Sequence, residues 1–281
     1  MTDKQLKKGT KQMRDKLLHT TPITKATSSR MTVVFFLLAF LFSFPFLIIG
    51  SITGIQLMPG LPIAALSIIC PMLAAIILTF ISNKSAGVAT LLKRSFDYKR
   101  IKVKIWYIPT LLLMPVVMVL SFWVLRLTGT PIPAPTIKLV PTLILCLVFF
   151  VGALGEEIGW SGYAIDPMQN RLGALLASLV LGLIWAVYHY IGLAQVDRSV
   201  EWIIWWTLGT VAMRVILVWI YNNTGKSVFA TALFHMMINV TWQLFPINGS
   251  YYDPRITSSI LALVSIIIIV FTRPKTLIRE T

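Results

Sequence analysis

Apolar residues fill the chain in long runs, and short polar segments between these runs hold most of the charges. Several runs approach the roughly 20 apolar residues that an α-helix needs to cross a hydrocarbon layer about 30 Å thick. Many of these residues are β-branched, but at this length in lipid only a helix satisfies its own backbone hydrogen bonds. The pattern predicts an all-α polytopic membrane protein with about eight transmembrane helices in one bundle. The predicted spans are approximately 32–50, 60–82, 105–127, 138–160, 171–193, 201–221, 227–246 and 256–272.

The polar connections complete the predicted organisation. Residues 1–30 are basic and longer than the charged start of a secretory signal peptide. We interpret them as a cytoplasmic tail that can lie on anionic lipid, at ~1 kcal/mol per basic residue near the surface. Residues 31–281 are predicted to form a single transmembrane helical domain. Alternating prolines in the connection at 128–136 predict a stiff, extended loop.

Composition excludes a soluble globular domain. Of the 281 residues, 57% are hydrophobic and only 12% are charged, whereas globular proteins carry roughly 25% charged residues. The net charge of +15 could indicate a nucleic-acid-binding protein. The positions of the basic residues favour another explanation, because they cluster in alternate connections between the apolar runs.

Lysine and arginine are enriched in the cytoplasmic loops of membrane proteins. With the N-terminus inside, the basic residues of the predicted inner segments after the tail are Lys84, Lys93, Arg94, Lys99, Arg100, Lys102, Lys104, Arg171, Lys226, Arg273, Lys275 and Arg279. Those of the outer segments are Arg126, Lys138, Arg198 and Arg255. The bias predicts a multi-pass protein of the cell membrane with both termini in the cytoplasm. It accounts for the net charge without a nucleic-acid partner.

Few ionisable residues remain inside the predicted spans: Glu156, Glu157, His189, Arg214 and His235. A charge at mid-bilayer costs ~2.5–3.5 kcal/mol on insertion scales, so such residues usually face the interior of the bundle and have a function. These five residues are therefore the candidates for a buried polar site.

The adjacent carboxylates Glu156 and Glu157 could lie on a short loop at the membrane interface. Against this, the chain stays apolar and aromatic after them until Asp166 and Pro167. The pair is therefore predicted to lie within the helix, about three turns from its inner end. Adjacent helical residues are ~100° apart, so two inward-facing carboxylates need different partners.

The two histidines lie on other helices. His189 is surrounded by aromatic residues, which also fits a position in an interfacial aromatic belt. His235 and Asn239 are four residues apart and share one helix face. Two histidines and a glutamate are a known zinc ligand set for a hydrolytic water, which makes Glu156, His189 and His235 candidate zinc ligands. Without a metal, the same groups could act as general base and oxyanion donors. The residues alone leave a hydrolase and an ion pathway open.

Three motifs in this order resemble the CPBP family of prenyl-protein (CAAX) endopeptidases and bacteriocin-processing proteins. They are the glutamate pair followed by GWSGY, then WAVYH about 30 residues later, then FHMMIN, all within about 145–242. The resemblance implies eight helices and hydrolysis of a peptide bond in a prenylated or membrane-associated substrate. It implies that Glu156, His189, His235 and Asn239 are catalytic and that Glu157 supports them. In such enzymes, a glutamate and a histidine activate water, while the other histidine and the asparagine polarise the scissile carbonyl. Members are commonly called metalloproteases.

The chain departs from the family pattern at one position. The family has an arginine four residues after the second glutamate, where this chain has Ser161. Arg214 lies in the middle of the sixth predicted span, about 10 Å from its inner end. We predict that Arg214 replaces the missing arginine as the ionic partner of Glu157.

Two other functions stay open at this point. The loss of the family arginine at Ser161 would suit a catalytically silent relative that acts as an immunity or scaffold protein. A transporter could use Glu156 and Glu157 as a proton or cation site, although the repeated halves with broken helices typical of transporters are not evident. Convergence of the polar atoms within ~3–5 Å would support hydrolysis. In a simple layout His189 lies nearer the outer side than Glu156 and His235, so convergence requires tilted or staggered helices, or a re-entrant start to the fifth span.

Overall fold

The computed structural model describes residues 29–246 and 248–278. The predicted basic tail therefore lies outside the described residues, apart from its last two positions, and its contact with anionic lipid stays a prediction. The described helices are α2 (Ser29–Thr53), α3 (Cys70–Lys93), α4 (Tyr107–Leu127), α5 (Leu139–Gly159), α6 (Ile165–Leu172), α7 (Ala174–Ala194), α8 (Val200–Asn223), α9 (Val228–Gln243) and α10 (Pro254–Val270).

The fold is the all-α membrane bundle that the sequence predicts, and each predicted span corresponds to one of these helices. Within the described residues, six helical stretches are long and apolar enough to cross a membrane. The remaining two predicted spans correspond to α9 and α10, which are shorter at 16 and 17 residues. Residues 131–138 between α4 and α5 form no helix or strand, as the alternating prolines predict.

The prediction of a helix over 60–82 is wrong at its start. Instead, β1 (Gln56–Met58) and β2 (Leu61–Pro62) form a short antiparallel hairpin. A 3₁₀ segment (Ile63–Ile69) follows, and α3 begins only at Cys70. The reason is proline chemistry: Pro62 cannot continue a helical hydrogen-bond pattern, whereas a proline in the first turn of α3 is favourable.

The predicted end of this span agrees with the structure to within about two residues. The backbone at Lys84 is not helical, with φ 55° and ψ −159°, so α3 consists of two helices that meet at a kink there. The first of them ends where the apolar run ends. The second places Lys93 in a helix, whereas the sequence predicts a loop.

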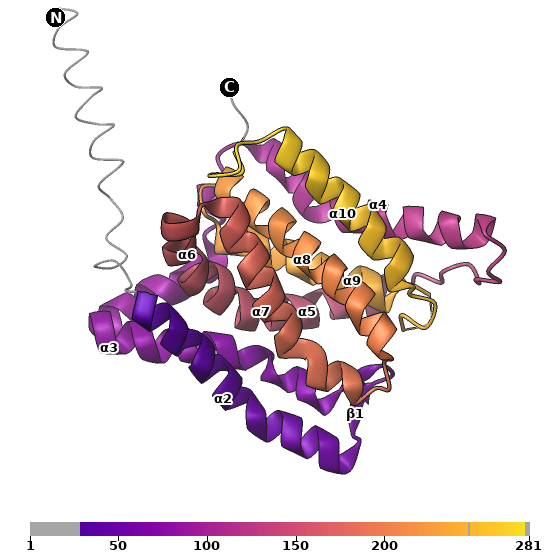
Figure 1. The fold of residues 1–281 in the computed structure, drawn as a ribbon, viewed down its shortest axis with the longest axis horizontal. Coiled ribbons are helices and arrows are strands. Elements are labelled where there is room, and N and C mark those ends of the chain that lie inside the picture. The colour runs from indigo at the N-terminus through magenta and orange to yellow at the C-terminus, as the bar shows by residue number, and fades with distance from the viewer. Residues whose placement is uncertain (1–28, 247, 279–281) are drawn as a thin grey trace, which may run out of the picture.

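The helices contact one another in a closed order around the bundle: α2, α3, α5, α9, α4, α10, α8, α7 and back to α2. Figure 1 shows α2 and α3 on one side and α4 and α10 on the opposite side, with α5, α7, α8 and α9 between them. The helices α8 and α9 also touch across this ring. The four central helices carry Glu156, Glu157, His189, Arg214, His235 and Asn239, the residues of the predicted site.

Helix α5 approaches the 3₁₀ segment and the start of α3 very closely. A Cβ atom on Gly155 would lie 2.7 Å from the carbonyl oxygen of Ile68, and one on Gly159 would lie 2.6 Å from that of Pro71. Small residues allow such backbone contact between membrane helices. These glycines flank Glu156 and Glu157 and fix the position of α5 against its neighbour.

The helical run of α5 does not end at residue 160. It passes through one π-helical turn (Trp160–Ala164) directly into α6, which ends at Leu172. Gly173, with φ +75°, then reverses the chain into α7. Glu156 thus lies about 24 Å before the end of α6, and His189 lies about 22 Å after the start of α7. The two residues return to a similar depth without a re-entrant segment.

Candidate active site

Glu156 and Glu157 are both buried, with 3% and 0% of their surface exposed. Their side chains have different partners, as expected for adjacent positions on a helix. These partners come from α7, α8 and α9, and from the π turn that follows α5.

Glu157 is surrounded by donors. Arg214 Nη1 donates to Glu157 Oε2 over 3.1 Å, and Ser161 donates its hydroxyl hydrogen to the same oxygen. The other oxygen, Oε1, lies 3.0 Å from His235 Nδ1. Arg214 is fully buried, and its guanidinium carbon lies 4.2 Å from the ring centre of Trp185. The ion pair that the sequence predicts is present, and Ser161 adds a hydrogen bond where the family has an arginine.

Glu156 has one oxygen held and one oxygen open. Trp160 Nε1 and Trp185 Nε1 donate to Oε2 over 2.9 and 2.6 Å. Oε1 lies 3.9 Å from His189 Nε2 and 4.0 Å from His235 Nε2. These two distances are too long for direct hydrogen bonds, but they suit one water between the groups, each partner being about 2.8 Å from it.

The hydrogen-bond partners of both histidines determine which ring nitrogen faces Glu156. His189 Nδ1 lies 2.7 Å from the backbone carbonyl of Trp185, which can only accept, so Nδ1 carries a hydrogen. His235 Nδ1 faces the Glu157 carboxylate in the same way. In both rings, Nε2 is therefore the atom left to act on a reacting group. The partner of the other nitrogen fixes the ring orientation.

Access to the site differs between the two histidines. The side chain of His189 is 31% exposed, whereas that of His235 is 3% exposed. Asn239 follows His235 by one turn of α9 and is partly exposed. Its side chain forms no hydrogen bond to another residue in the described part of the chain. His189 and Asn239 are thus the members of the predicted set that an incoming peptide can reach most easily.

The indole of Trp160 is held in place by packing. Trp160 is completely buried, and its ring lies 5.5 Å from that of Phe35, 6.1 Å from that of Phe36 and 5.6 Å from that of Tyr188. Aromatic rings at these separations attract one another beyond the burial of their surface. The packing leaves the indole N–H of Trp160 directed at the Glu156 carboxylate.

The candidate zinc ligands were tested against the geometry that zinc requires. Two ligands of a tetrahedral zinc ion, each ~2.0–2.1 Å from it, stand about 3.3 Å apart. Glu156 Oε1 is 3.9 and 4.0 Å from the two histidine nitrogens, and the described residues contain no group of three metal-binding side chains close enough to hold an ion. This spacing does not fit a tetrahedral zinc ion, and metal binding stays a prediction for experiment.

Two tryptophans that bind Glu156, Trp160 and Trp185, are not among the predicted site residues. A signal for Trp160 was present, because it lies one helical turn after Glu156. Trp185 lies one turn before His189 in the WAVYH motif. Both were grouped with the apolar residues of their spans, although an indole N–H usually finds a partner when it is buried.

Comparisons with known proteins point to the same family that the sequence motifs resemble. Residues 138–241 match the family model described as type II CAAX prenyl endopeptidase, Rce1-like. The chain is also 28% identical over 242 residues to the CAAX prenyl protease 2 of Methanococcus maripaludis, covering 80% of this chain and 85% of that protein. The matched region contains both glutamates, both histidines and Asn239. Both comparisons support the resemblance of this chain to the CPBP family, that of the CAAX-type intramembrane endopeptidases.

Proposed function

We propose that this protein hydrolyses a peptide bond in a prenylated or otherwise membrane-associated peptide, using a water activated by Glu156 and a histidine. The observation that carries the proposal is the open oxygen of Glu156, which faces the Nε2 atoms of His189 and His235 at 3.9 and 4.0 Å. A buried carboxylate with one oxygen held and the other beside two histidine nitrogens is suited to positioning and deprotonating water.

In the proposed reaction, a water sits between Glu156 Oε1 and His189 Nε2. Its oxygen attacks the carbonyl carbon of the scissile bond, and its proton moves to Glu156. The carbon–nitrogen bond then breaks, and Glu156 returns the proton to the leaving amine. The two indole donors on Oε2 keep the carboxylate oriented throughout, because they bind the oxygen that does not react.

His235 and Asn239 are proposed to bind the carbonyl oxygen as negative charge develops on it. For this step His235 carries a proton on Nε2 in addition to the one on Nδ1. The neighbouring Glu157 carboxylate, 3.0 Å from Nδ1, stabilises the resulting positive charge. Donors directed at such an oxyanion usually make a large contribution to catalysis, with about 2.7–4 kcal/mol lost when one is removed. Glu157 and Arg214 act here through His235.

The substrate class follows from the membrane setting and from the name of the relative. A CAAX prenyl protease acts on a prenylated peptide, and a site built inside a helical bundle suits a lipid-anchored chain. The loop charges further support a protein with both termini in the cytoplasm. The Arg214–Glu157 pair removes the reason that Ser161 gave for a catalytically silent scaffold or immunity protein.

The test is hydrolysis by the purified protein reconstituted in liposomes. The probes are a farnesylated peptide with a CAAX-type C-terminus and the same peptide without the lipid. We expect cleavage of the farnesylated peptide by the wild type and none by Glu156→Gln, since Gln keeps the shape but cannot accept the proton. If the mutant retains more than a few per cent of wild-type turnover, the assignment of Glu156 is wrong. If the wild type cleaves neither peptide, the proposed substrate class is wrong.

A further inference from the structure

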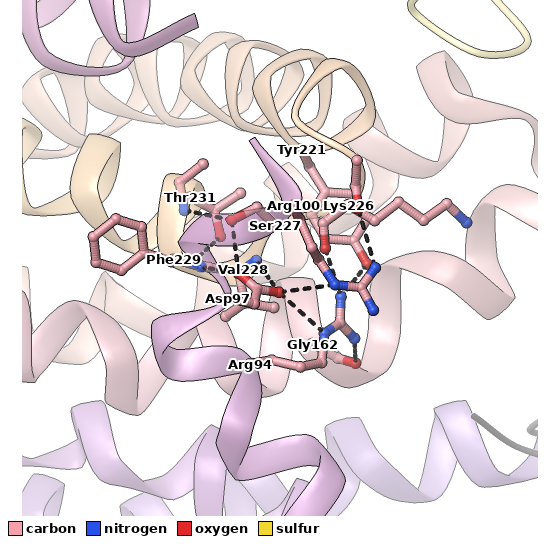
Figure 2. A network of polar contacts seen from close by, with 12 residues as sticks. Arg94, Asp97, Arg100, Gly162, Tyr221, Lys226, Ser227, Val228, Phe229 and Thr231 are labelled. Carbon is pink, nitrogen blue, oxygen red and sulfur yellow. Dashed lines mark hydrogen bonds and ion pairs between the residues drawn. The ribbon is translucent and has the colours of Figure 1, made fainter. Parts of the chain in front are cut away.

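Arg94, in the 3₁₀ turn (Arg94–Phe96) after α3, is a buried arginine outside the candidate active site. It is 5% exposed, and its guanidinium makes three hydrogen bonds to three parts of the chain. Arg94 Nη1 donates to the Gly162 carbonyl over 2.7 Å. Arg94 Nη2 donates to the Tyr221 hydroxyl over 2.6 Å and to the Lys226 carbonyl over 3.0 Å. Figure 2 shows Arg94 with these three partners.

The bond to Gly162 places a side-chain donor on a carbonyl of the π turn. In this turn, the N–H of Ile165 donates to the carbonyl of Trp160, five residues earlier. The residue five positions after Gly162 is Pro167, which has no N–H to donate at this spacing. A buried carbonyl without a donor costs free energy comparable to a lost hydrogen bond. Arg94 gives the Gly162 carbonyl a donor that does not depend on the spacing of the helix.

This π turn holds one donor to each glutamate. Trp160 donates to Glu156, and Ser161 donates to Glu157, each from one turn further along the helix. Gly162 is the next residue. Single π turns within α-helices are frequent at functional sites, and a change toward regular α-helical spacing here would rotate both donors relative to the glutamates.

The neighbouring Asp97 fixes the second helix that forms the site. Its carboxylate accepts from the Ser227 hydroxyl over 2.7 Å and from the Phe229 backbone N–H over 3.1 Å. A carboxylate at a helix N-terminus binds free N–H groups and complements the helix dipole. These contacts hold the start of α9, two turns before His235. Arg94 Nε lies 3.9 Å from the same carboxylate.

We propose that Arg94 is a positioning residue for the catalytic centre: it holds the π turn in the register that directs Trp160 at Glu156 and Ser161 at Glu157. This inference rests on the proposed function for its kinetic test. Arg94 touches neither glutamate, so it acts only through Gly162 and the turn. Tyr221 and Lys226 hold the guanidinium in place for that contact.

The test compares Arg94→Met with the matched control Arg100→Met. Arg100 belongs to the same polar network, where it lies 3.4 Å from Asp97 and donates to the Gly225 carbonyl over 3.1 Å, but it has no bond to the π turn. We expect Arg94→Met to lower kcat roughly 10- to 100-fold, as the loss of residues that orient a site and ångström-scale misplacement do, with KM within about threefold. Arg100→Met should keep the wild-type kcat.

A rescue variant distinguishes positioning from general destabilisation. Pro167→Ala supplies a backbone N–H five residues after Gly162, the spacing of the bond between Ile165 and Trp160 in the π turn. We expect Arg94→Met combined with Pro167→Ala to regain several-fold in kcat over Arg94→Met alone. A rise in melting temperature without any gain in kcat would show that the turn does not control the site, and the proposal would fail.

The indole ¹H–¹⁵N resonance of Trp160, assigned with Trp160→Phe, gives a readout that needs no substrate. We expect it to shift in Arg94→Met, to stay in place in Arg100→Met and to return toward its wild-type position in the rescue variant. An unshifted Trp160 resonance with wild-type kcat in folded Arg94→Met would overturn the proposal.

If Arg94→Met does not fold, Arg94→Lys tests the role of Arg94 in its place. Lysine keeps the charge but cannot bind the three acceptors at once. We therefore expect a smaller shift of the Trp160 resonance and a smaller loss of kcat than for Arg94→Met. Wild-type values for both in Arg94→Lys would contradict the proposal. If the wild type shows no turnover, the proposed function fails by itself, and the Trp160 resonance still tests the role of Arg94.

Discussion

The surroundings of Glu157 and of Glu156 differ sharply, although the two residues are neighbours in sequence. Both oxygens of Glu157 are occupied by close donors from Arg214, His235 and Ser161. Glu156 has donors on one oxygen only, and its other oxygen faces two histidine nitrogens across about 4 Å gaps. The Glu157 carboxylate thus has hydrogen-bond donors on both oxygens, whereas Glu156 has one oxygen free to bind water.

The difference separates a structural role from a chemical one. A buried charge without its partner is costly, so removing one member of the Glu157 cluster should weaken the fold. An oxygen that is held but not saturated can exchange a proton with water, so changing Glu156 should weaken the reaction. The shared residue is His235, which bonds to Glu157 through Nδ1 and faces Glu156 through Nε2.

The largest expected effect is on stability. Arg214→Ala leaves the Glu157 charge buried without its cation, and breaking such a pair costs ~3–5 kcal/mol. We expect a marked fall in the melting temperature in detergent, measured by the fluorescence of a thiol-reactive or intrinsic probe. Adding Glu157→Gln to Arg214→Ala should restore part of the loss, because neither buried charge then remains. If the double mutant is no more stable than Arg214→Ala, the pair is not what holds this region together.

The next effect is on catalysis. His235→Ala and Asn239→Ala should each lower kcat by about 10²- to 10³-fold, as expected for the loss of an oxyanion donor. Residues that act as one unit show strongly non-additive losses. The double alanine mutant should therefore be little worse than the poorer single mutant in a steady-state peptidase assay. Simple multiplication of the two single effects would indicate that the two residues serve separate steps.

A smaller effect is expected from Ser161→Ala. This change removes one of three donors to Glu157 and leaves the Arg214 ion pair in place. The net contribution of a typical hydrogen bond is about 1 kcal/mol. Thermal unfolding should show a loss of stability well below that of Arg214→Ala. Equal losses would mean that Ser161, and not Arg214, is the main partner of Glu157.

The smallest effect is expected from metal removal. Because the spacing around Glu156 does not fit a tetrahedral zinc ion, dialysis against a chelator should leave turnover of the farnesylated peptide within about twofold. The control is a second sample treated with chelator and then supplied with excess zinc. Loss of activity on dialysis, restored by zinc, would show that Glu156, His189 and His235 close around a metal in solution.

Hydropathy predicted the fold because long apolar runs leave a chain in lipid few alternatives. The hairpin at Gln56–Met58 and Leu61–Pro62 escaped this reasoning, since a strand of a few residues has no periodic signal. The second part of α3 was missed for a different reason. Helical structure resumes after the kink at Lys84 and ends at Lys93, and this stretch is too short to be detected as a membrane span.

For the site, the sequence predicted which charged groups are close together but not which uncharged groups orient them. A buried arginine such as Arg214 needs an acidic partner. Glu157 lacks the arginine that the family has at the position of Ser161, so the pairing of Arg214 with Glu157 could be inferred. Trp160 and Trp185 lie in apolar runs, so their indole N–H groups were not recognised as hydrogen-bond donors of the site. Arg94 was predicted to be one of several basic residues in a cytoplasmic loop. Its bond to Gly162 depends on a π turn, which no sequence pattern indicated.

The most direct test of the contrast between the two carboxylates is to measure turnover and melting temperature together for Glu156→Gln and Glu157→Gln in one membrane preparation. We expect Glu156→Gln to lose turnover while its melting temperature stays near that of the wild type. Glu157→Gln should lose stability, because Arg214 is left as a buried unpaired charge, and should keep measurable turnover reduced about 10- to 100-fold. The opposite pattern, or the same behaviour in both variants, would contradict the division of roles between Glu156 and Glu157.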